Sequence, residues 1–247
     1  MDQVGIIIPV YNEAANIGIA LTRIFQEVTV PFKVYIVYDF DEDSTLEPAR
    51  ETASQFKKEI VFLKNQYGRG ALNAIKTGLR QVTAEFLVVT MADLSDPPTV
   101  INAMVQRARD ESYDLVCGSR YMPGGSQQGG PGLKSALSRI AGMSLHFLTQ
   151  IPTRDCTNSF KLYRKAMLDQ LTIESSGGFE IGLELVVKAF TGGFKVGEVP
   201  TSWVDRSNGE SRFRLFAWLP KYLKWYLFAI QASLFRRLFG RQFRRQT

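Results

Sequence analysis

Short continuous runs of apolar residues alternate along the chain with segments in which apolar residues recur at helical spacing. The runs cover residues 4–10, 33–38, 60–64, 86–90 and 114–118. Runs of this length, bounded by turn-forming residues, are typical of strands buried on both faces. The segments that follow them, such as residues 14–28 and 46–58, have the spacing of helices. Because the links are short, the pattern predicts an α/β fold, a mostly parallel sheet with helices on both faces.

The pattern changes after residue 121. Residues 122–132 contain five glycines and two prolines, which predicts an irregular, mobile loop beside a site. Beyond it we expect a helix, a short strand, a second helix and a further strand. These elements are expected at residues 134–150, 161–163, 176–190 and 195–202.

Polar side chains stand where the predicted strands end. Asp93 follows the strand at 86–90, and the carboxyl edge of an open α/β sheet is where ligands bind. Ser95 and Asp96 are expected to accept N–H groups of the helix that opens with two prolines.

The acidic turn at residues 39–45 has two interpretations. In one, a ligand or cation relieves the repulsion between its carboxylates. In the other, it is a solvated turn in which Ser44 or Thr45 caps the following helix.

Composition narrows the class of protein. The chain has 247 residues, 45% of them hydrophobic, enough for one large domain. Its two cysteines, Cys117 and Cys156, form neither a disulfide framework nor a metal-binding spacing, which favours a reducing compartment. No basic region precedes the first apolar run, so no cleaved secretory signal is expected. The net charge is +6, and Glu210 is the only acidic residue from 206 onward, which favours an anionic partner for this end.

In residues 213–247 aromatic and aliphatic side chains alternate with basic ones. The longest uncharged run, residues 225–235, has eleven residues, whereas a spanning helix needs roughly 18. Trp and Tyr favour the headgroup boundary and clustered arginines favour anionic lipid, so this tail is expected to lie in a membrane interface. The alternatives are a helix packed on the domain or in an oligomer, and a nucleic-acid-binding tail, for which no binding module is recognisable.

Five short motifs, taken in order, resemble those of family 2 glycosyltransferases with the GT-A fold. They are Ile-Pro-Val-Tyr-Asn-Glu at 8–13, the acidic turn at 39–45, Met-Ala-Asp-Leu-Ser-Asp-Pro-Pro at 91–98, Gly-Ser-Arg-Tyr at 118–121 and Gly-Glu-Ser-Arg at 209–212. The chain looks most like the group that glycosylates polyprenyl or dolichyl phosphate. The resemblance covers residues 4–214 and implies a catalytic domain at 1–212, with the membrane-interface tail at 213–247.

The resemblance implies a donor site and an acceptor site. Asp93 would face the diphosphate of a nucleotide sugar through a divalent cation, Mg²⁺ or Mn²⁺. The base and ribose would be held by Pro9, Tyr11, Glu13 and Asp39, and the diphosphate charge would be neutralised by Arg206 and Arg212. The acceptor phosphate would be received by Arg120, Lys134 and Ser138.

Two departures from the family's pattern bear on the chemistry. Met91 stands where the first Asp of an Asp-x-Asp motif is usual, and a thioether prefers soft ions to Mg²⁺ or Mn²⁺. Binding of the cation would then depend on Asp93 together with the donor phosphates, or the positive charge of Arg206 and Arg212 would take the place of the cation. Glu180 lies near the position of a catalytic base in relatives that glycosylate hydroxyl groups, and completes a candidate catalytic set with Asp93 and Arg120. Its other interpretation is an early-helix acid favoured by the helix dipole.

The function implied by the resemblance is an inverting transfer of one hexose from a nucleotide sugar to a polyprenyl phosphate, peripherally at the cytoplasmic face of a membrane. GDP-mannose is the first expected donor and UDP-glucose the second. A phosphate nucleophile is already ionised at neutral pH and needs no protein base. Two alternatives stay open: transfer to a saccharide hydroxyl with Glu180 as base, and a non-catalytic nucleotide-sugar-binding subunit. No nucleic-acid partner is expected.

Overall fold

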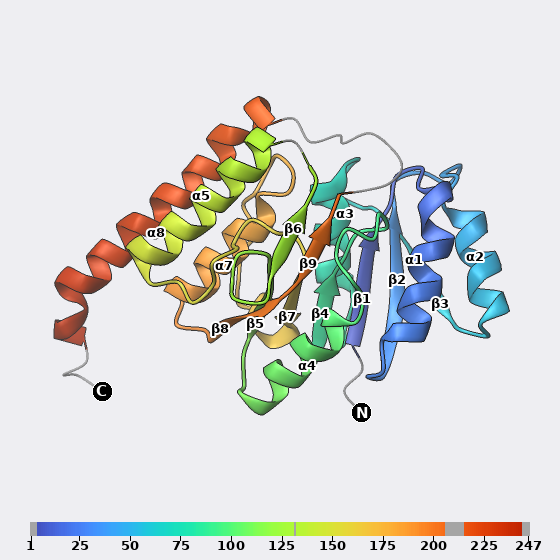
Figure 1. Ribbon diagram of the computed structural model, residues 1–247, viewed down its shortest axis with the longest axis horizontal. Helices are drawn as coiled ribbons and strands as arrows, with labels where there is room; N and C mark the ends of the chain where they lie inside the picture. Colours follow the sequence, from blue (N-terminus) through green and yellow to red (C-terminus); the bar gives the residue numbers. More distant parts are fainter. Residues whose placement is uncertain (1–3, 131, 206–214, 244–247) are drawn as a thin grey trace.

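Strand pairing organises the chain around one large sheet (Figure 1). The computed structural model describes residues 4–130, 132–205 and 215–243, without the side chains of residues 134, 215–218 and 236–243. Within these residues the sheet has seven strands in the order β3-β2-β1-β4-β7-β5-β8. They are β1 (Val4–Pro9), β2 (Phe32–Tyr38), β3 (Ile60–Lys64), β4 (Phe86–Val89), β5 (Leu115–Ser119), β7 (Lys161–Arg164) and β8 (Val196–Pro200). All but β7 run parallel to one another, which confirms the predicted α/β sheet.

Helices cover both faces of this sheet, as predicted. One face packs against α1 (Ala14–Glu27), α2 (Leu46–Gln55) and α4 (Val100–Asp110). The other packs against α3 (Ala71–Gln81) and α7 (Ile181–Thr191). Since successive side chains of a strand point to opposite faces, every central strand contributes to both apolar clusters. The sheet therefore forms the middle layer and leaves its carboxyl edge for loops.

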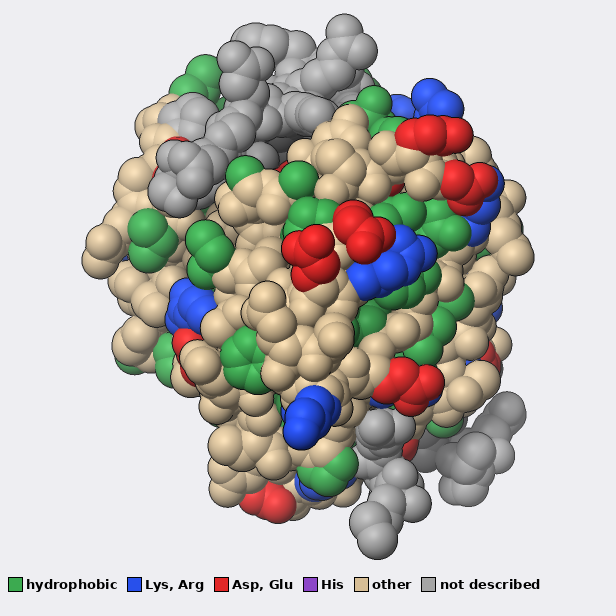
Figure 2. All heavy atoms as spheres, turned by 90° about the vertical axis from the view of Figure 1, so that its right-hand side faces the viewer, with side chains coloured by type: hydrophobic (Ala, Val, Ile, Leu, Met, Phe, Trp, Pro, Cys, Tyr) green, Lys and Arg blue, Asp and Glu red, His purple; other side chains and the backbone are tan. Residues whose placement is uncertain are grey.

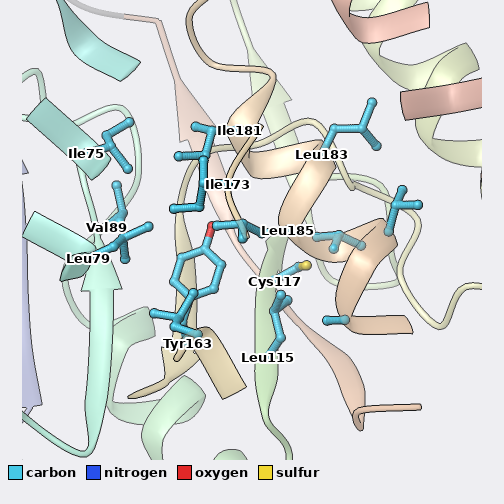
Figure 3. Packing of buried hydrophobic residues seen from close by; sticks show 14 of the residues in the cluster. Ile75, Leu79, Val89, Leu115, Cys117, Tyr163, Ile173, Ile181, Leu183 and Leu185 are labelled. Atoms are coloured by element: carbon cyan, nitrogen blue, oxygen red, sulfur yellow. The ribbon is translucent and has the colours of Figure 1, made fainter. Parts of the chain in front are cut away.

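The antiparallel strand β7 lies between β4 and β5 and is followed by the short helix α6 (Lys165–Leu168). Tyr163 of β7 stands opposite Leu87 and Leu115 and lies among the buried side chains of Figure 3. Burial of a large apolar side chain contributes roughly 1.5–3 kcal/mol, so packing fixes this strand. Because β7 runs backwards, its first residue, Lys161, lies at the edge where the parallel strands end. The segment before it is thus brought to that edge.

The glycine-rich loop at 122–132, predicted to be irregular, contains a strand. β6 (Ser126–Gln128) pairs in parallel with β9 (Ser202–Val204) as a separate two-stranded sheet. The strand predicted at 195–202 is divided between β8 and β9 at Thr201, whose carbonyl accepts the N–H of Ser126 at 3.0 Å. Glycines at positive φ stand on either side of β6, at 124, 129 and 130. They permit the sharp turns that let three polar residues pair.

Two predicted helix boundaries are wrong by several residues. The helix expected from 176 begins at Ile181, because the N–H groups of Gly177 and Gly178 bind the Glu180 carboxylate instead of continuing a helix. The helix expected to reach 58 ends at Gln55, and Lys57 has a φ of 51°, in the left-handed region. A residue in this conformation ends a helix.

The tail forms one long helix, α8 (Leu215–Phe243), which packs on α7 and on α5 (Gly132–Thr149). Figure 1 shows α5 and α8 side by side at one end of the molecule. Trp225 and Ala229 of α8 are buried in the apolar core. The helix thus packs on the domain, as one of the sequence alternatives had it, while the side away from the core carries many exposed apolar side chains. Exposed apolar side chains on these helices include Leu133, Ile140, Phe147, Leu148, Leu219, Leu223, Leu227, Leu234 and Phe235.

The opposite end of the molecule, formed by α1, α2 and β3, has a mixed surface. Figure 2 shows acidic and basic side chains next to one another there, with apolar side chains between them. The pairs Lys33–Glu59 and Arg50–Glu47 have N–O distances of 3.1 and 3.5 Å. Exposed pairs of this kind contribute about 0–1 kcal/mol each. Charges of both signs therefore share this face, in contrast to the many exposed apolar side chains of α5 and α8.

Candidate active site

The predicted donor residues follow strands that are direct neighbours in the sheet. β2, β1 and β4 lie side by side and run parallel, so Pro9, Asp39 and Asp93 come at the same edge. Arg120 follows β5, which ends at this edge too. The topology thus brings together Asp39, Asp93 and Arg120, which are far apart in the sequence, at the edge where such sheets bind ligands.

Asp43 holds the turn after β1 against the turn after β2. Its buried carboxylate accepts the N–H of Asn12 at 3.1 and 3.2 Å, and both the N–H and the hydroxyl of Thr45 at 2.9 and 2.5 Å. The Thr45 hydroxyl in turn accepts the N–H of Glu13 at 2.8 Å. Thr45 is the N-cap residue of α2 but makes no side-chain cap, so the interpretation in which Thr45 caps this helix is wrong. Asp43 and Thr45 instead fix the backbone that presents Tyr11 and Glu13.

Asp39 joins the end of β2 to the start of α3. Its half-buried carboxylate accepts from Asn65 Nδ2 at 2.7 Å and from the N–H of Gly70, at the N-terminus of α3, at 2.9 Å. Beside it, the rings of Tyr11 and Phe40 meet edge to face, with centroids 5.5 Å apart. Tyr11 is exposed, while Phe40 is half-buried with the Arg69 guanidinium over its ring, 5.3 Å from the centroid. An exposed aromatic ring next to a carboxylate can hold a planar, hydrogen-bonding group such as a nucleotide base.

The loop after β4 turns sharply at Leu94, which has a φ of 57°. The N–H of Ser95 donates to Asp93 Oδ1 at 3.1 Å, which orients that carboxylate. Helix α4 starts at Val100 with Thr99 as its N-cap residue, so the prediction that Ser95 and Asp96 cap this helix is wrong.

Asp96 instead links the loop after β4 to the neighbouring segments. One carboxylate oxygen, Oδ1, accepts from Asn158 Nδ2 at 3.2 Å and from the hydroxyl of Thr201 at 2.9 Å. Burial raises the pKa of Asp96 to about 6, against the opposing effect of these two hydrogen bonds. A carboxyl that titrates close to neutral pH therefore stands where the loops meet.

Arg120 forms a buried ion pair with Asp155. Its Nε and Nη2 lie 2.6 and 2.9 Å from the two carboxylate oxygens, and its backbone N–H adds a third bond at 3.0 Å. The Asp155 side chain is fully buried and that of Arg120 nearly so. Burial alone raises the pKa of Asp155, but the charge and hydrogen bonds of Arg120 hold it below its ordinary value. Despite burial, Asp155 raises the pKa of Arg120, so the guanidinium stays charged.

The hydroxyl of Ser138, on α5, contacts three other members of this cluster. It accepts from Arg120 Nη2 at 2.9 Å and from the Tyr121 hydroxyl at 3.0 Å, and lies 2.6 Å from the Thr157 hydroxyl. We call Arg120, Tyr121, Ser138, Asp155 and Thr157 the arginine cluster. Of the predicted acceptor residues, two thus contact each other directly.

Glu180 is fully buried, and its carboxylate accepts the N–H groups of Ser176, Gly177 and Gly178 at 3.2, 2.6 and 2.5 Å. These three bonds close the loop before α7. The interpretation as an early-helix acid matches this place, because Glu180 is the N-cap residue. Its catalytic role stays a prediction, and the observed contacts give the carboxylate a structural one.

Three predicted residues have no described side chain. Arg206 and Arg212 lie outside the described residues, and so does the Gly-Glu-Ser-Arg motif at 209–212. The backbone of Lys134 lies in α5, and its side chain is not among the described ones. Their roles stay predictions.

We call the edge where Asp39 and Asp93 lie the donor edge. It fits a divalent cation that is bound jointly with a nucleotide sugar. Within the described part of the chain, no three His, Cys, Asp or Glu side chains gather to hold a metal ion. Asp93 offers a hard oxygen ligand, whereas the Met91 thioether does not suit Mg²⁺ or Mn²⁺. Mg²⁺ is commonly held by one or two carboxylates plus substrate phosphates, and Asp93 would supply the protein's part of such a set.

Comparison of the chain with models of protein families identifies the family to which this site belongs. The model of the family described as glycosyl transferase family 2 matches residues 5–172, more than half of the chain. The chain belongs to glycosyl transferase family 2. The matched region contains the donor edge and the arginine cluster, so this chain is a glycosyltransferase, and the resemblance drawn from its motifs is confirmed.

Curated relatives of this glycosyltransferase cover most of its length. Polyprenol monophosphomannose synthase of Mycolicibacterium smegmatis is 30% identical over 84% of this chain and 79% of that protein. Dolichol-phosphate mannosyltransferase of Saccharomyces cerevisiae is 28% identical over 94% of this chain and 90% of that protein. The enzyme of that name from Pyrococcus furiosus is 28% identical over 86% of this chain, which spans only 59% of that protein.

Solved structures confirm the fold. Glucosyl-3-phosphoglycerate synthase of Mycobacterium tuberculosis, in complex with Mn²⁺, UDP-glucose and phosphoglyceric acid, matches with a TM-score of 0.69. The match covers 93% of this chain and 80% of that one, at 14% sequence identity. This family 2 glycosyltransferase therefore has the GT-A fold.

Sequence reasoning missed several residues of the site. The sequence pattern assigns no site role to Asp155, Thr157 or Asn158, and it places Gln127 only in an irregular loop. The available signal was a dense polar run, Arg154 to Ser159, directly before a buried strand. Only the reversed direction of β7 puts that run beside Arg120.

Proposed function

We propose that this glycosyltransferase moves a hexose from a nucleotide sugar to a polyprenyl phosphate with inversion at the anomeric carbon. GDP-mannose is the first candidate donor and UDP-glucose the second. The observation that carries the proposal is the composition of α5. This helix contributes Ser138 to the arginine cluster and turns exposed apolar side chains, Ile140 and Phe147, outward. One helix thus carries partners for a phosphate group and for the hydrocarbon chain attached to it.

The names of the relatives support this acceptor. Two are named for mannosyl transfer to dolichol phosphate and one for making polyprenol monophosphomannose. The chemistry of the arginine cluster agrees with them. A permanently charged guanidinium, held by Asp155 and flanked by hydroxyls, is suited to a phosphate oxygen.

On the donor side, the half-buried carboxylate of Asp39 and the Tyr11–Phe40 pair are suited to a base and ribose. Asp93 lies in the loop after β4, which is separated from β2 by β1, and would hold the divalent cation together with the donor diphosphate. Such a cation, when bound, stabilises the charge that develops on the departing nucleoside diphosphate. Arg206 and Arg212 are proposed to add positive charge there.

The chain's own residues then have distinct tasks. Arg120 binds and orients the acceptor phosphate, whose oxygen is already ionised and attacks the anomeric carbon from the side opposite the leaving group. Orientation of this kind contributes much of the rate in a two-substrate reaction. No side chain has to remove a proton, which agrees with the structural contacts of Glu180.

We further propose that the enzyme works peripherally at a membrane, on the cytoplasmic face. Within the described residues no helix is both long enough and apolar enough to cross a bilayer. The apolar outer sides of α5 and α8 offer a surface that can lie in the lipid interface. Residues 213–247 are proposed as the membrane-interface segment and 1–212 as the catalytic domain, although α8 packs firmly on α5 and α7.

Transfer to lipid tests the proposal. The purified chain is incubated with vesicles containing a polyprenyl phosphate and, in separate reactions, with radiolabelled GDP-mannose or UDP-glucose. We expect label in the organic phase with one donor, visible by thin-layer chromatography, and loss of at least about tenfold in rate on Arg120→Met. Label that reaches the lipid from neither donor would contradict the proposal. Repeating the reaction with a chelator shows whether a cation takes part.

A further inference from the structure

The Tyr121 hydroxyl stands between two hydrogen-bond acceptors. One belongs to the arginine cluster and the other lies beside it. Its oxygen lies 3.0 Å from Gln127 Oε1 and 3.0 Å from Ser138 Oγ. A phenol has one proton, so at any moment it donates to only one of them. The amide of Gln127 is oriented by donation from Nε2 to Ser135 Oγ at 2.7 Å, which turns its oxygen toward Tyr121.

The Ser138 hydroxyl also has a limited capacity, one proton and two lone pairs. Arg120 Nη2 donates to one lone pair. If Tyr121 donates to the other, the Ser138 proton goes to Thr157, 2.6 Å away, and Thr157 donates to Asp155 Oδ1 at 3.2 Å. In this arrangement Ser138 has nothing left to donate to a phosphate.

A second arrangement distributes the protons differently. Thr157 can donate to Ser138 in place of Asp155, because either hydroxyl of that pair can be the donor. The lone pairs of Ser138 are then filled by Arg120 and Thr157, and its proton can turn to a phosphate oxygen. Tyr121 must at the same time donate to Gln127, since Ser138 can accept no third bond.

From this proton accounting we propose that Tyr121, paired with Gln127, is a positioning residue that lets Ser138 donate to the acceptor phosphate. The inference deepens the proposed function and rests on it, since it takes Arg120 and Ser138 as the phosphate partners. Burial raises the pKa of Tyr121, which keeps its proton in place at neutral pH. The Arg120 guanidinium lies over the Tyr121 ring, 4.9 Å from its centroid, and β6 holds Gln127 in its ladder with β9.

The two side chains therefore have opposite expected effects. Gln127→Leu removes the alternative acceptor, keeps the Tyr121 proton on Ser138 and should weaken phosphate binding about tenfold, the effect of one lost hydrogen bond to a charged group. Tyr121→Phe removes the competing proton and should change binding by less than about threefold. In the double variant the Phe replacement should restore binding to the level of Tyr121→Phe alone.

The experiment measures the affinity of each variant for farnesyl phosphate by calorimetric titration, with Gln128→Leu as the matched control on the same strand. Gln128 is exposed, and its backbone, not its side chain, bonds Asp205. Titration with the donor nucleotide and thermal unfolding of each variant check that the fold and the donor edge are intact.

The outcomes separate the inference from the proposed function. Restored binding in the double variant supports the inference, since a merely structural role predicts two losses that add. A double variant as weak as Gln127→Leu, or a Gln127→Leu equal to Gln128→Leu, overturns it while the proposed acceptor stands. A wild-type chain that does not bind farnesyl phosphate overturns the proposed acceptor, and the inference with it.

Discussion

The donor edge and the arginine cluster are held together by different kinds of contact. At the donor edge, Asp39 and Asp43 accept bonds mostly from backbone N–H groups and small polar side chains of nearby turns. In the arginine cluster, the guanidinium of Arg120 and the carboxylate of Asp155 form an ion pair away from water. The first arrangement depends on turn geometry and the second on burial of opposite charges.

This difference decides how much a mutation in each region lowers the free energy of unfolding. A half-buried N–H group that loses a carboxylate can bind water, so the expected loss is about 1 kcal/mol. A buried guanidinium that loses its partner leaves an uncompensated charge, with an expected loss of about 3–5 kcal/mol. The acceptor side is therefore coupled to global stability, whereas the donor side can be altered with less effect on folding.

The largest expected effect comes from Asp155→Ala. It leaves Arg120 buried without its counter-charge and removes three hydrogen bonds to that residue. We expect the free energy of unfolding in urea to fall by about 3–5 kcal/mol.

The matched control is Glu85→Ala, which removes the carboxylate partner of Arg164 in a partly exposed pair. Its expected loss is about 0–1 kcal/mol. If Asp155→Ala cost no more than Glu85→Ala, the distinction between a buried and a partly exposed ion pair would fail.

The two regions also differ in how far the sequence predicts them. The donor edge is visible in the chain because each part follows its own apolar run, and parallel strands put their carboxyl ends at one edge. Asp39 and Asp93 could be placed there without coordinates. The Asp155 carboxylate could not, because its partner lies 35 residues away and only the reversal of β7 brings them together.

Short polar elements escape pattern reasoning for a related reason. β6 has three polar residues between glycines, which carry no periodic signal, and its pairing with β9 is decided by the tertiary fold. Glu180 likewise matched a helical pattern, but its side chain competes for the N–H groups of Gly177 and Gly178 and delays the helix.

An intermediate effect is expected at Asp96, which joins the two regions. Its pKa is raised to about 6 in the folded protein, from an ordinary value of 3.8, so the folded state binds a proton more tightly than the unfolded state. Stability should therefore decrease as the pH rises from about 4 to about 6, by an amount on the order of 3 kcal/mol. Asp96→Asn cannot titrate and should lose this dependence.

Urea unfolding of the wild type and Asp96→Asn at several pH values measures the difference. The asparagine variant should gain relative stability as the pH rises through this window. Asp155 has the opposite sign, because its lowered pKa makes its contribution fade only as the pH falls below the ordinary range. The Glu85→Ala variant shows whether loss of any carboxylate changes the profile. Parallel profiles for wild type and Asp96→Asn would contradict the raised pKa.

The smallest expected effect on folding is at Asp39. Asp39→Asn should lower stability by about 1 kcal/mol or less, because its partners Asn65 and Gly70 are reached by water. Asp43→Asn should cost more, about 2 kcal/mol, since this carboxylate is buried and its bonds to Asn12 and Thr45 are not replaced. Donor nucleotide affinity, measured by calorimetric titration, should fall with Asp39→Asn while farnesyl phosphate affinity remains unchanged. A loss of stability at Asp39 that exceeds the loss at Asp43 would contradict the reasoning from burial. Weaker farnesyl phosphate binding would mean that the two regions do not divide the substrates between them.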